Sequence, residues 1–262
     1  MVEITPLDQA HAAMDAVSAG DDKAALAFYG RLATSELFVL LRDEAQGETI
    51  KPEIFEVGDQ TFLLAFDTET RLANFAERAV PYVAMSGRAL AQMLHGQGTG
   101  IALNPEVAPS SMLLPPEAMS WLSDALAQSP SETEARISKV GPPTGLPETL
   151  ITSLDSHLAT TEGLAQNAYL VGVRYENGAS GHLMGFVGAL LGSETALARA
   201  VQEALVFSGV EAGAVDVAFF DNSDPMSAAL ARHGLRFELP QPETALHPLP
   251  PGMDPDKPPK LV

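Results

Sequence analysis

Two aspartates just after an apolar run are the residues with the clearest potential for chemistry. Asp221 and Asp224 follow VDVAFF in the segment FFDNSDP. Carboxylates at the end of a strand can supply the oxygen ligands that hard cations prefer, and α/β proteins often bind ligands at such positions. A structural role is the alternative, because Asp224 before Pro225 is typical of a helix N-cap followed by proline at the first helical position. Asp221 and Asp224 are therefore candidate ligand-binding residues.

Asn104 is the third candidate ligand-binding residue. It ends the segment GIALNP in a loop, and loops carry a large share of functional residues. Its alternative role is a turn in which the side chain bonds its own backbone. Gly96, Gly98 and Gly100 lie upstream in HGQGTG, but a phosphate-binding loop leads from a strand into a helix, and here the order is reversed. That segment is expected to end a helix and turn into a strand.

No catalytic constellation is recognisable in the sequence. Cysteine is absent, which removes thiolate nucleophiles, disulfides and Cys-ligated metals. Ser193 is expected to be an N-cap, since no Gly-x-Ser-x-Gly motif surrounds it. His157 and His233 lie near predicted helix C-termini, where a partly cationic ring interacts favourably with the dipole. No two His residues have the i, i+3 or i+4 spacing of a helical metal site; they are at positions 11, 95, 157, 182, 233 and 247. We predict no catalytic residue, no metal site and no cofactor, with metal assistance through Asp221 and Asp224 as the alternative.

The elements that must position these residues begin with an amphipathic helix at 22–33 and the buried strand ELFVLL. IFEV and TFLLAF form a hairpin around Gly58-Asp59. Thr68 and Ser86 are expected to cap two helices, and Pro115-Pro116-Glu117 opens another. These elements complete an α+β domain over residues 1–128.

The second half, residues 129–240, has a different element order. A helix at 147–160 leads to NAYLVGVRY and GHLMGFVGAL, followed by a helix at 194–208, VDVAFF, a helix from Pro225 and RFEL. When ISKV is counted as the first strand, the order is βαββαβ, as in ferredoxin-like folds. The fold class expected for the whole chain is α+β with two small mixed domains. Residues 241–262 contain seven prolines and are expected to form an extended tail that folding does not need.

Charge and hydropathy narrow the possible partners. With 34 acidic and 15 basic side chains the net charge is -19, which disfavours nucleic acid because that affinity depends on neutralising phosphates. The most apolar stretch is shorter than the ~20 residues that span a bilayer, and the first residues do not resemble a signal peptide. We expect a cytoplasmic protein that binds neither nucleic acid nor membrane.

The second sheet is predicted to be apolar on both faces. Helices can cover one face, and the other face then needs a cover because large exposed apolar patches usually mark interfaces. We expect this second face to pack against the first domain or a second subunit; closure by the helix from Pro225 is the alternative. The face is carried by Tyr169, Val171, Val173 and Tyr175, which alternate along NAYLVGVRY.

The first half resembles the N-terminal domain of the SseB family, the enhanced serine sensitivity proteins. The resemblance covers about residues 22–128 and is carried by AFYGRLATSELFVLL, FDTETRLANFA, YVAMSGRAL and GIALNP before LLPPEAMSWL. Where the family often has Phe-Thr, this chain has Phe66-Asp67-Thr68. The second half is similar to that family's C-terminal domain more loosely, through the segment from Pro143 to Leu150 and the strand AYLVGV.

The resemblance implies a fold and a loose link to amino-acid metabolism, and it carries no catalytic residues. We therefore expect a non-enzymatic interaction or regulatory module that binds an unidentified protein partner or itself. The alternative functions are a metal-assisted enzyme and a sensor that binds a small amino acid between its two halves.

Overall fold

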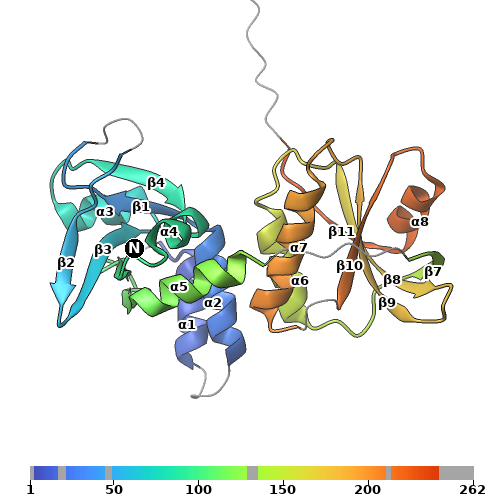
Figure 1. Ribbon diagram of the computed structural model, residues 1–262, viewed down its shortest axis with the longest axis horizontal. Helices are drawn as coiled ribbons and strands as arrows, with labels where there is room; N and C mark the ends of the chain where they lie inside the picture. The colour runs from blue at the N-terminus through green and yellow to red at the C-terminus, as the bar shows by residue number, and fades with distance from the viewer. Residues whose placement is uncertain (1–2, 17–21, 45–48, 129–134, 211–213, 242–262) are drawn as a thin grey trace, which may run out of the picture.

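The computed structural model describes residues 3–16, 22–44, 49–128, 135–210 and 214–241. These residues form two units, each built around its own mixed sheet (Figure 1). The α+β class expected from the sequence is confirmed. The boundary at 128 stays a prediction, because residues 129–134 lie outside the described part, and so do most of the expected tail residues, 242–262.

The first unit contains a sheet with the strand order β4-β1-β3-β5-β6, in which β2 also pairs with β3. β3 and β5 are parallel, and the other pairs are antiparallel. Its elements are α1 (Pro6–Ala16), α2 (Asp22–Thr34), β1 (Glu36–Leu40), β2 (Ile54–Val57), β3 (Gln60–Phe66), α3 (Glu69–Ala76), β4 (Tyr82–Ser86), α4 (Gly87–Leu94), β5 (Thr99–Leu103), β6 (Met112–Leu114) and α5 (Pro116–Leu126).

Both faces of this sheet are buried, which explains the nearly continuous apolar sequence of β3. Leu63 and Ala65 point into a core shared with α1, α2, α4 and α5. Phe62, Leu64 and Phe66 alternate with them and pack on the opposite side, where α3 supplies the cover.

Local signals in the first unit act as expected. The Thr68 hydroxyl accepts a hydrogen bond from the Arg71 amide at 3.2 Å and caps α3, and the Ser86 hydroxyl does the same for the Ala89 amide in α4. The β2–β3 hairpin turns at Gly58, whose φ of 62° is accessible to glycine at little cost. The HGQGTG segment turns from α4 into β5, as its glycine spacing indicated.

The second unit has a sheet with the order β10-β9-β8, and both β7 and β11 pair with the remaining edge of β8. β7 takes residues 172–175 of that edge and β11 takes residues 168–170. Its elements are β7 (Ile137–Gly141), α6 (Glu148–Leu158), β8 (Asn167–Tyr175), β9 (Ser180–Val187), α7 (Glu194–Ser208), β10 (Val215–Phe220), α8 (Pro225–His233) and β11 (Leu235–Phe237).

The element order βαββαβ is present from β7 to β10, but the ferredoxin-like arrangement is not. In that arrangement the first strand lies between the third and the fourth. Here β9 and β10 are direct parallel neighbours, and β7 pairs antiparallel with β8 at the far side. The order of elements along a chain does not fix which strand edges meet, so the expectation was correct for the elements and wrong for their pairing.

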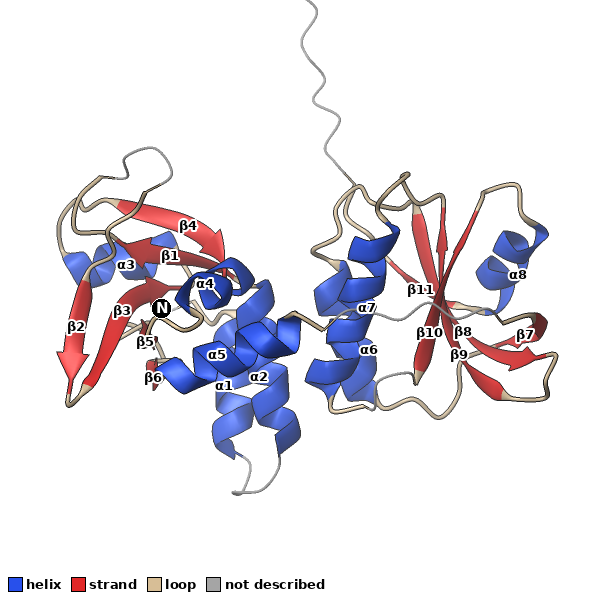
Figure 2. Ribbon diagram, viewed as in Figure 1, coloured by secondary structure: helices blue, strands red, loops and turns tan. Residues whose placement is uncertain are grey.

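Helices cover both faces of the second sheet. α6 and α7 pack on one face, and α8 lies on the other (Figure 2). The two units meet through α6 and α7, which contact α2 and α5 of the first unit. Phe207 from α7 belongs to the first unit's core, so this helix contributes to two cores.

Candidate functional site

The loop after β10 holds the two candidate aspartates in structural roles. The Asp224 carboxylate accepts a hydrogen bond from the Met226 amide at 2.7 Å and caps α8. Asp221 is exposed, and its backbone carbonyl accepts hydrogen bonds from the Ser227 hydroxyl at 2.7 Å and from the Asp224 amide at 3.0 Å. Within the described ranges no cluster of three or more His, Asp or Glu side chains could hold a metal. The alternative foreseen for Asp224, an N-cap before proline, is the geometry observed.

Asn104 is fully buried, with a left-handed backbone at φ 45°. Its side-chain oxygen accepts a hydrogen bond from the Asp67 amide at 3.1 Å, and its side-chain nitrogen donates to the Ser110 hydroxyl at 2.9 Å. The side chain therefore joins two separate chain segments instead of bonding its own backbone. Because the residue has no exposed surface, a ligand cannot reach it in this conformation.

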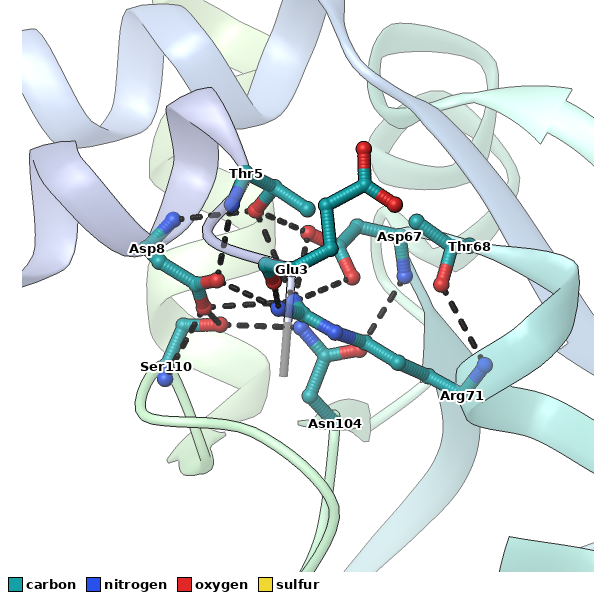
Figure 3. A network of polar contacts seen from close by, with 8 residues as sticks. All are labelled: Glu3, Thr5, Asp8, Asp67, Thr68, Arg71, Asn104 and Ser110. Carbon is teal, nitrogen blue, oxygen red and sulfur yellow. Dashed lines mark hydrogen bonds and ion pairs between the residues drawn. The ribbon is translucent and has the colours of Figure 1, made fainter. Parts of the chain in front are cut away.

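Asn104 borders an ionic network centred on Arg71 (Figure 3). The Arg71 guanidinium donates to both Asp67 carboxylate oxygens at 2.7 and 2.9 Å, to the Glu3 carbonyl at 2.9 Å, and to Asp8 through a short bidentate contact. The Arg71, Asp67 and Asp8 side chains are each at most 5% exposed. Such burial requires that every charge is paired.

The network sets the charge state of Asp8. Burial alone would raise the pKa of this carboxyl, but hydrogen bonds from Arg71 and Ser110 outweigh it and lower the pKa from 3.8 to about 2. Asp8 is therefore ionised at neutral pH, as its contact with Arg71 requires. The network ties the start of α1 to α3 and to the loop after β5, which is a stabilising role.

Sequence reasoning missed this network, although part of its signal was available. Asp67 and Arg71 have the i, i+4 spacing that places two side chains together at a helix start. Asp67 is also the residue at which the chain differs from the Phe-Thr pattern of the resembling family. Asp8 and Ser110 could not have been found, because only the fold brings them to the site.

The predicted interface on β8 lies largely under α8. Val171 is fully buried and Val173 is 5% exposed, and both pack in a cluster with Leu230 of α8. Tyr169 and Tyr175 lie at the margin of this cluster and are half-buried. This face is therefore closed by α8, the helix that begins at Pro225, which was the alternative expected from the sequence.

The expected contact between this β8 face and the first unit is wrong. The first unit contacts α6 and α7, which lie on the opposite side of the sheet (Figure 2). The physical reason is that α7 is apolar on two sides, so it packs on the sheet and on the first unit's helices at once. α6 meets α2 through polar side chains, as in the hydrogen bond that Arg31 donates to the Ser156 hydroxyl at 2.7 Å. Contact of the β8 face with a second subunit stays a prediction.

Tyr175 has a partner at the rim of that face. Its hydroxyl donates a short hydrogen bond to the Asp216 carboxylate of β10. Burial and the neighbouring carboxylate raise the pKa of Tyr175, so the phenol stays protonated. Asp216 thus has a neutral partner that satisfies part of its hydrogen-bonding capacity.

His157 lies in the contact between the units rather than at an exposed helix end. Its ring stacks on Phe207 with centroids 5.6 Å apart, and Nδ1 bonds the Ser153 carbonyl at 2.9 Å. Nε2 has no hydrogen-bond partner among the described residues. Burial lowers the pKa of His157, so the ring is neutral, and the expectation of a partly cationic capping ring is wrong.

Ser193 differs from its expected role as well. It precedes α7, but its hydroxyl donates to the Leu164 and Leu190 carbonyls at 3.0 and 2.7 Å and does not cap the helix. The hydroxyl thereby links two loops beside the sheet. It is 7% exposed, which does not suit a nucleophile that must meet a substrate.

β10 is the terminal strand of its sheet, and within the described ranges no strand pairs with its outer edge. The Phe220 carbonyl accepts a hydrogen bond from the Gly188 amide, so the backbone of Phe220 faces β9. Since backbone groups alternate along a strand, those of Val217 and Phe219 face the open edge. The strand has one charge, and its last four residues are apolar and half-buried. Such an edge is a template for pairing with another chain.

Comparison with known proteins bears on the first unit. Residues 11–121 match the SseB protein N-terminal domain family. The searches of curated proteins and of solved structures gave no match. None of the helices in the described ranges is long and apolar enough to cross a membrane. The similarity of the second unit to the family's C-terminal domain stays a prediction.

Proposed function

We propose that this chain, whose residues 11–121 match the SseB protein N-terminal domain family, is a non-enzymatic cytoplasmic interaction module. It pairs with a second copy of itself through the outer edge of β10. The open edge of β10 is the observation that carries the proposal. An unpaired strand with four consecutive half-buried apolar residues gains hydrogen bonds and buries apolar area when another strand is added.

A second copy of β10 fits this edge because it avoids a clash of like charges. In an antiparallel pair whose two-fold axis passes through Ala218, Asp216 lies opposite Phe220 of the other copy and not opposite itself. The Asp216 carboxylate also accepts a hydrogen bond from the Tyr175 hydroxyl. The pairing joins the two sheets into one continuous sheet, as in strand addition at other exposed edges.

The test compares two proline substitutions in the same strand. Val217→Pro removes an N–H that faces the open edge, so we expect a monomer by light scattering with an intact circular dichroism spectrum. Ala218→Pro removes an N–H that faces β9, so we expect unfolding or a large loss of stability. A wild-type mass that is monomeric at every concentration contradicts the proposal.

A cross-linking experiment tests the same pairing with a smaller change to the strand than proline makes. The chain has no cysteine, so Ala218→Cys introduces a single thiol beside the expected two-fold axis. Opposite Cα atoms in an antiparallel pair are about 4.5–5.5 Å apart, which suits a disulfide. We expect a covalent dimer under mild oxidation and none from Asn177→Cys, which places a thiol in the exposed β8–β9 turn. Equal cross-linking of the two variants contradicts the pairing.

A further inference from the structure

Three basic side chains gather where β7, β8 and β9 lie side by side. Lys139 on β7 pairs with Arg174 on β8. His182 on β9 pairs with Gly172, which lies two residues before Arg174 on β8 and on the same face. They border an open concavity of about 600 Å³. Its lining includes Lys139, Gly141, Thr144, Gly172, Arg174 and His182.

A β-bulge in β7 brings Lys139 to this face. Ile137 pairs with Tyr175 and Lys139 pairs with Arg174, so Ser138 is an extra residue in the strand. In a regular strand Ile137 and Lys139 would share one face. The bulge lets Ile137 pack with the α8 cluster while Lys139 joins the opposite face. The Ser138 hydroxyl fixes the bulge by donating to the Arg174 carbonyl at 2.9 Å.

This placement is electrostatically unfavourable for the protein alone. Like charges directly opposite each other on a sheet are destabilising. Within the described ranges neither Lys139 nor Arg174 forms an ion pair, and the described residues that line the concavity include no acidic side chain. The unneutralised pair therefore suggests a ligand that supplies the negative charge.

The floor of the concavity is free of side chains. Gly141 and Gly172 are paired directly across the β7–β8 ladder. A Cβ atom on Gly172 would lie 2.8 Å from the Pro142 carbonyl, so that position requires glycine. A Cβ atom on Gly141 would meet no atom within 4 Å, so the space above Gly141 is open. His182 is held at the wall by a 3.0 Å hydrogen bond between Nε2 and the Thr144 carbonyl.

We propose that this concavity binds a small anion carrying phosphate or carboxylate groups. The Arg174 guanidinium offers a planar fork that matches either oxyanion, and Lys139 adds a compact charge beside it. The volume lies within the range of small-molecule sites. The concavity is lined by β7, β8 and β9 and by Ala214 just before β10, but Val217 and Phe219, whose backbone faces the open edge, do not line it. Binding there is therefore separable from the proposed self-association.

The test is calorimetric titration of the full chain at fixed ionic strength, with pyrophosphate and citrate as the two probes. The stronger probe identifies the oxyanion class. We expect Arg174→Gln and Lys139→Gln each to weaken binding about tenfold or more, since each removes a charge-assisted hydrogen bond to the anion. Arg199→Gln removes an exposed charge from α7 and should leave binding unchanged.

A filling variant separates the shape of the site from its charge. Gly141→Leu keeps Lys139 and Arg174 but occupies the open floor, so binding should be lost while the melting temperature changes little. Equal weakening by Arg199→Gln shows non-specific attraction and overturns the site, and so does undetectable binding of both probes to the wild-type chain.

Discussion

Replacing Asp8 with asparagine tests whether the Arg71 network acts through charge. The substitution keeps the size of the side chain and removes its negative charge. Arg71 then keeps Asp67 as its only carboxylate in the network, and the short bidentate contact to residue 8 is lost. Because these side chains are almost completely buried, water cannot replace the missing partner.

The depressed pKa of Asp8 gives the magnitude and its pH dependence. Lowering the pKa of Asp8 from 3.8 to about 2 corresponds to roughly 2 kcal/mol of unfolding free energy. A carboxyl whose pKa is lower in the folded state stabilises the fold above pH 3.8, and this contribution disappears as the pH falls toward 2. Asp8→Asn should therefore cost about 2 kcal/mol at pH 7, with a much smaller difference from wild type near pH 2.

The measurement is urea denaturation followed by the fluorescence of Trp121, the single tryptophan of the chain. Trp121 lies on α5 and packs on Tyr29 with ring centroids 5.0 Å apart, so it reports the first unit. Asp59→Asn is the matched control, because Asp59 is exposed in the β2–β3 turn where asparagine is equally suited. If Asp8→Asn lowers the free energy of unfolding by the same amount at pH 7 and near pH 2, the network does not act through the charge of Asp8.

Three further predictions concern the unit contact and the tail. Arg88→Met leaves the buried carboxylate of Glu203 without its bidentate partner, so it should lower the free energy of unfolding, measured by thermal melting, by about 3–5 kcal/mol. Adding Glu203→Met should recover part of that loss, because the unpaired buried charge is then removed. Gly30→Ala places a Cβ 2.7 Å from the Cβ of Phe207 and should cost about 1–3 kcal/mol in denaturant unfolding; an unchanged midpoint would contradict the close packing. Truncation after Pro240 should leave the melting temperature nearly unchanged, although it removes the hydrogen bonds that Gln241 donates to the Ala165 and Leu239 carbonyls. A loss of several degrees would show that the tail packs on the core.

Features that depend on a few neighbouring residues followed from the sequence. The Thr68 and Asp224 caps and the hairpin at Gly58 were recognisable because capping and turn geometry involve side chains and backbone groups within about four residues of each other. The alternation along β8 likewise indicated that the second sheet is apolar on both faces. The α+β class follows from these local patterns.

Contacts between distant segments were decided only by the tertiary structure. From its sequence position Asn104 was expected to lie in an accessible loop. In the structure its side chain is buried and hydrogen-bonds to the Asp67 amide and the Ser110 hydroxyl. His157 looked like a cationic cap, and the packing of α6 against the first unit makes it neutral.

The sequence by itself determined most of the elements, the Thr68, Ser86 and Asp224 caps, the acidic charge and the resemblance of the first unit to the SseB family. It did not reveal α1, β4 or β6. The tertiary structure decided which strand edges meet, and therefore that β10 has an open edge and that Lys139 lies beside Arg174. Periodicity reports which side of an element is apolar, but many packings bury the same apolar sides. Strand pairing and the position of a single bulge depend on the free energy of the whole fold, so local patterns cannot reveal them.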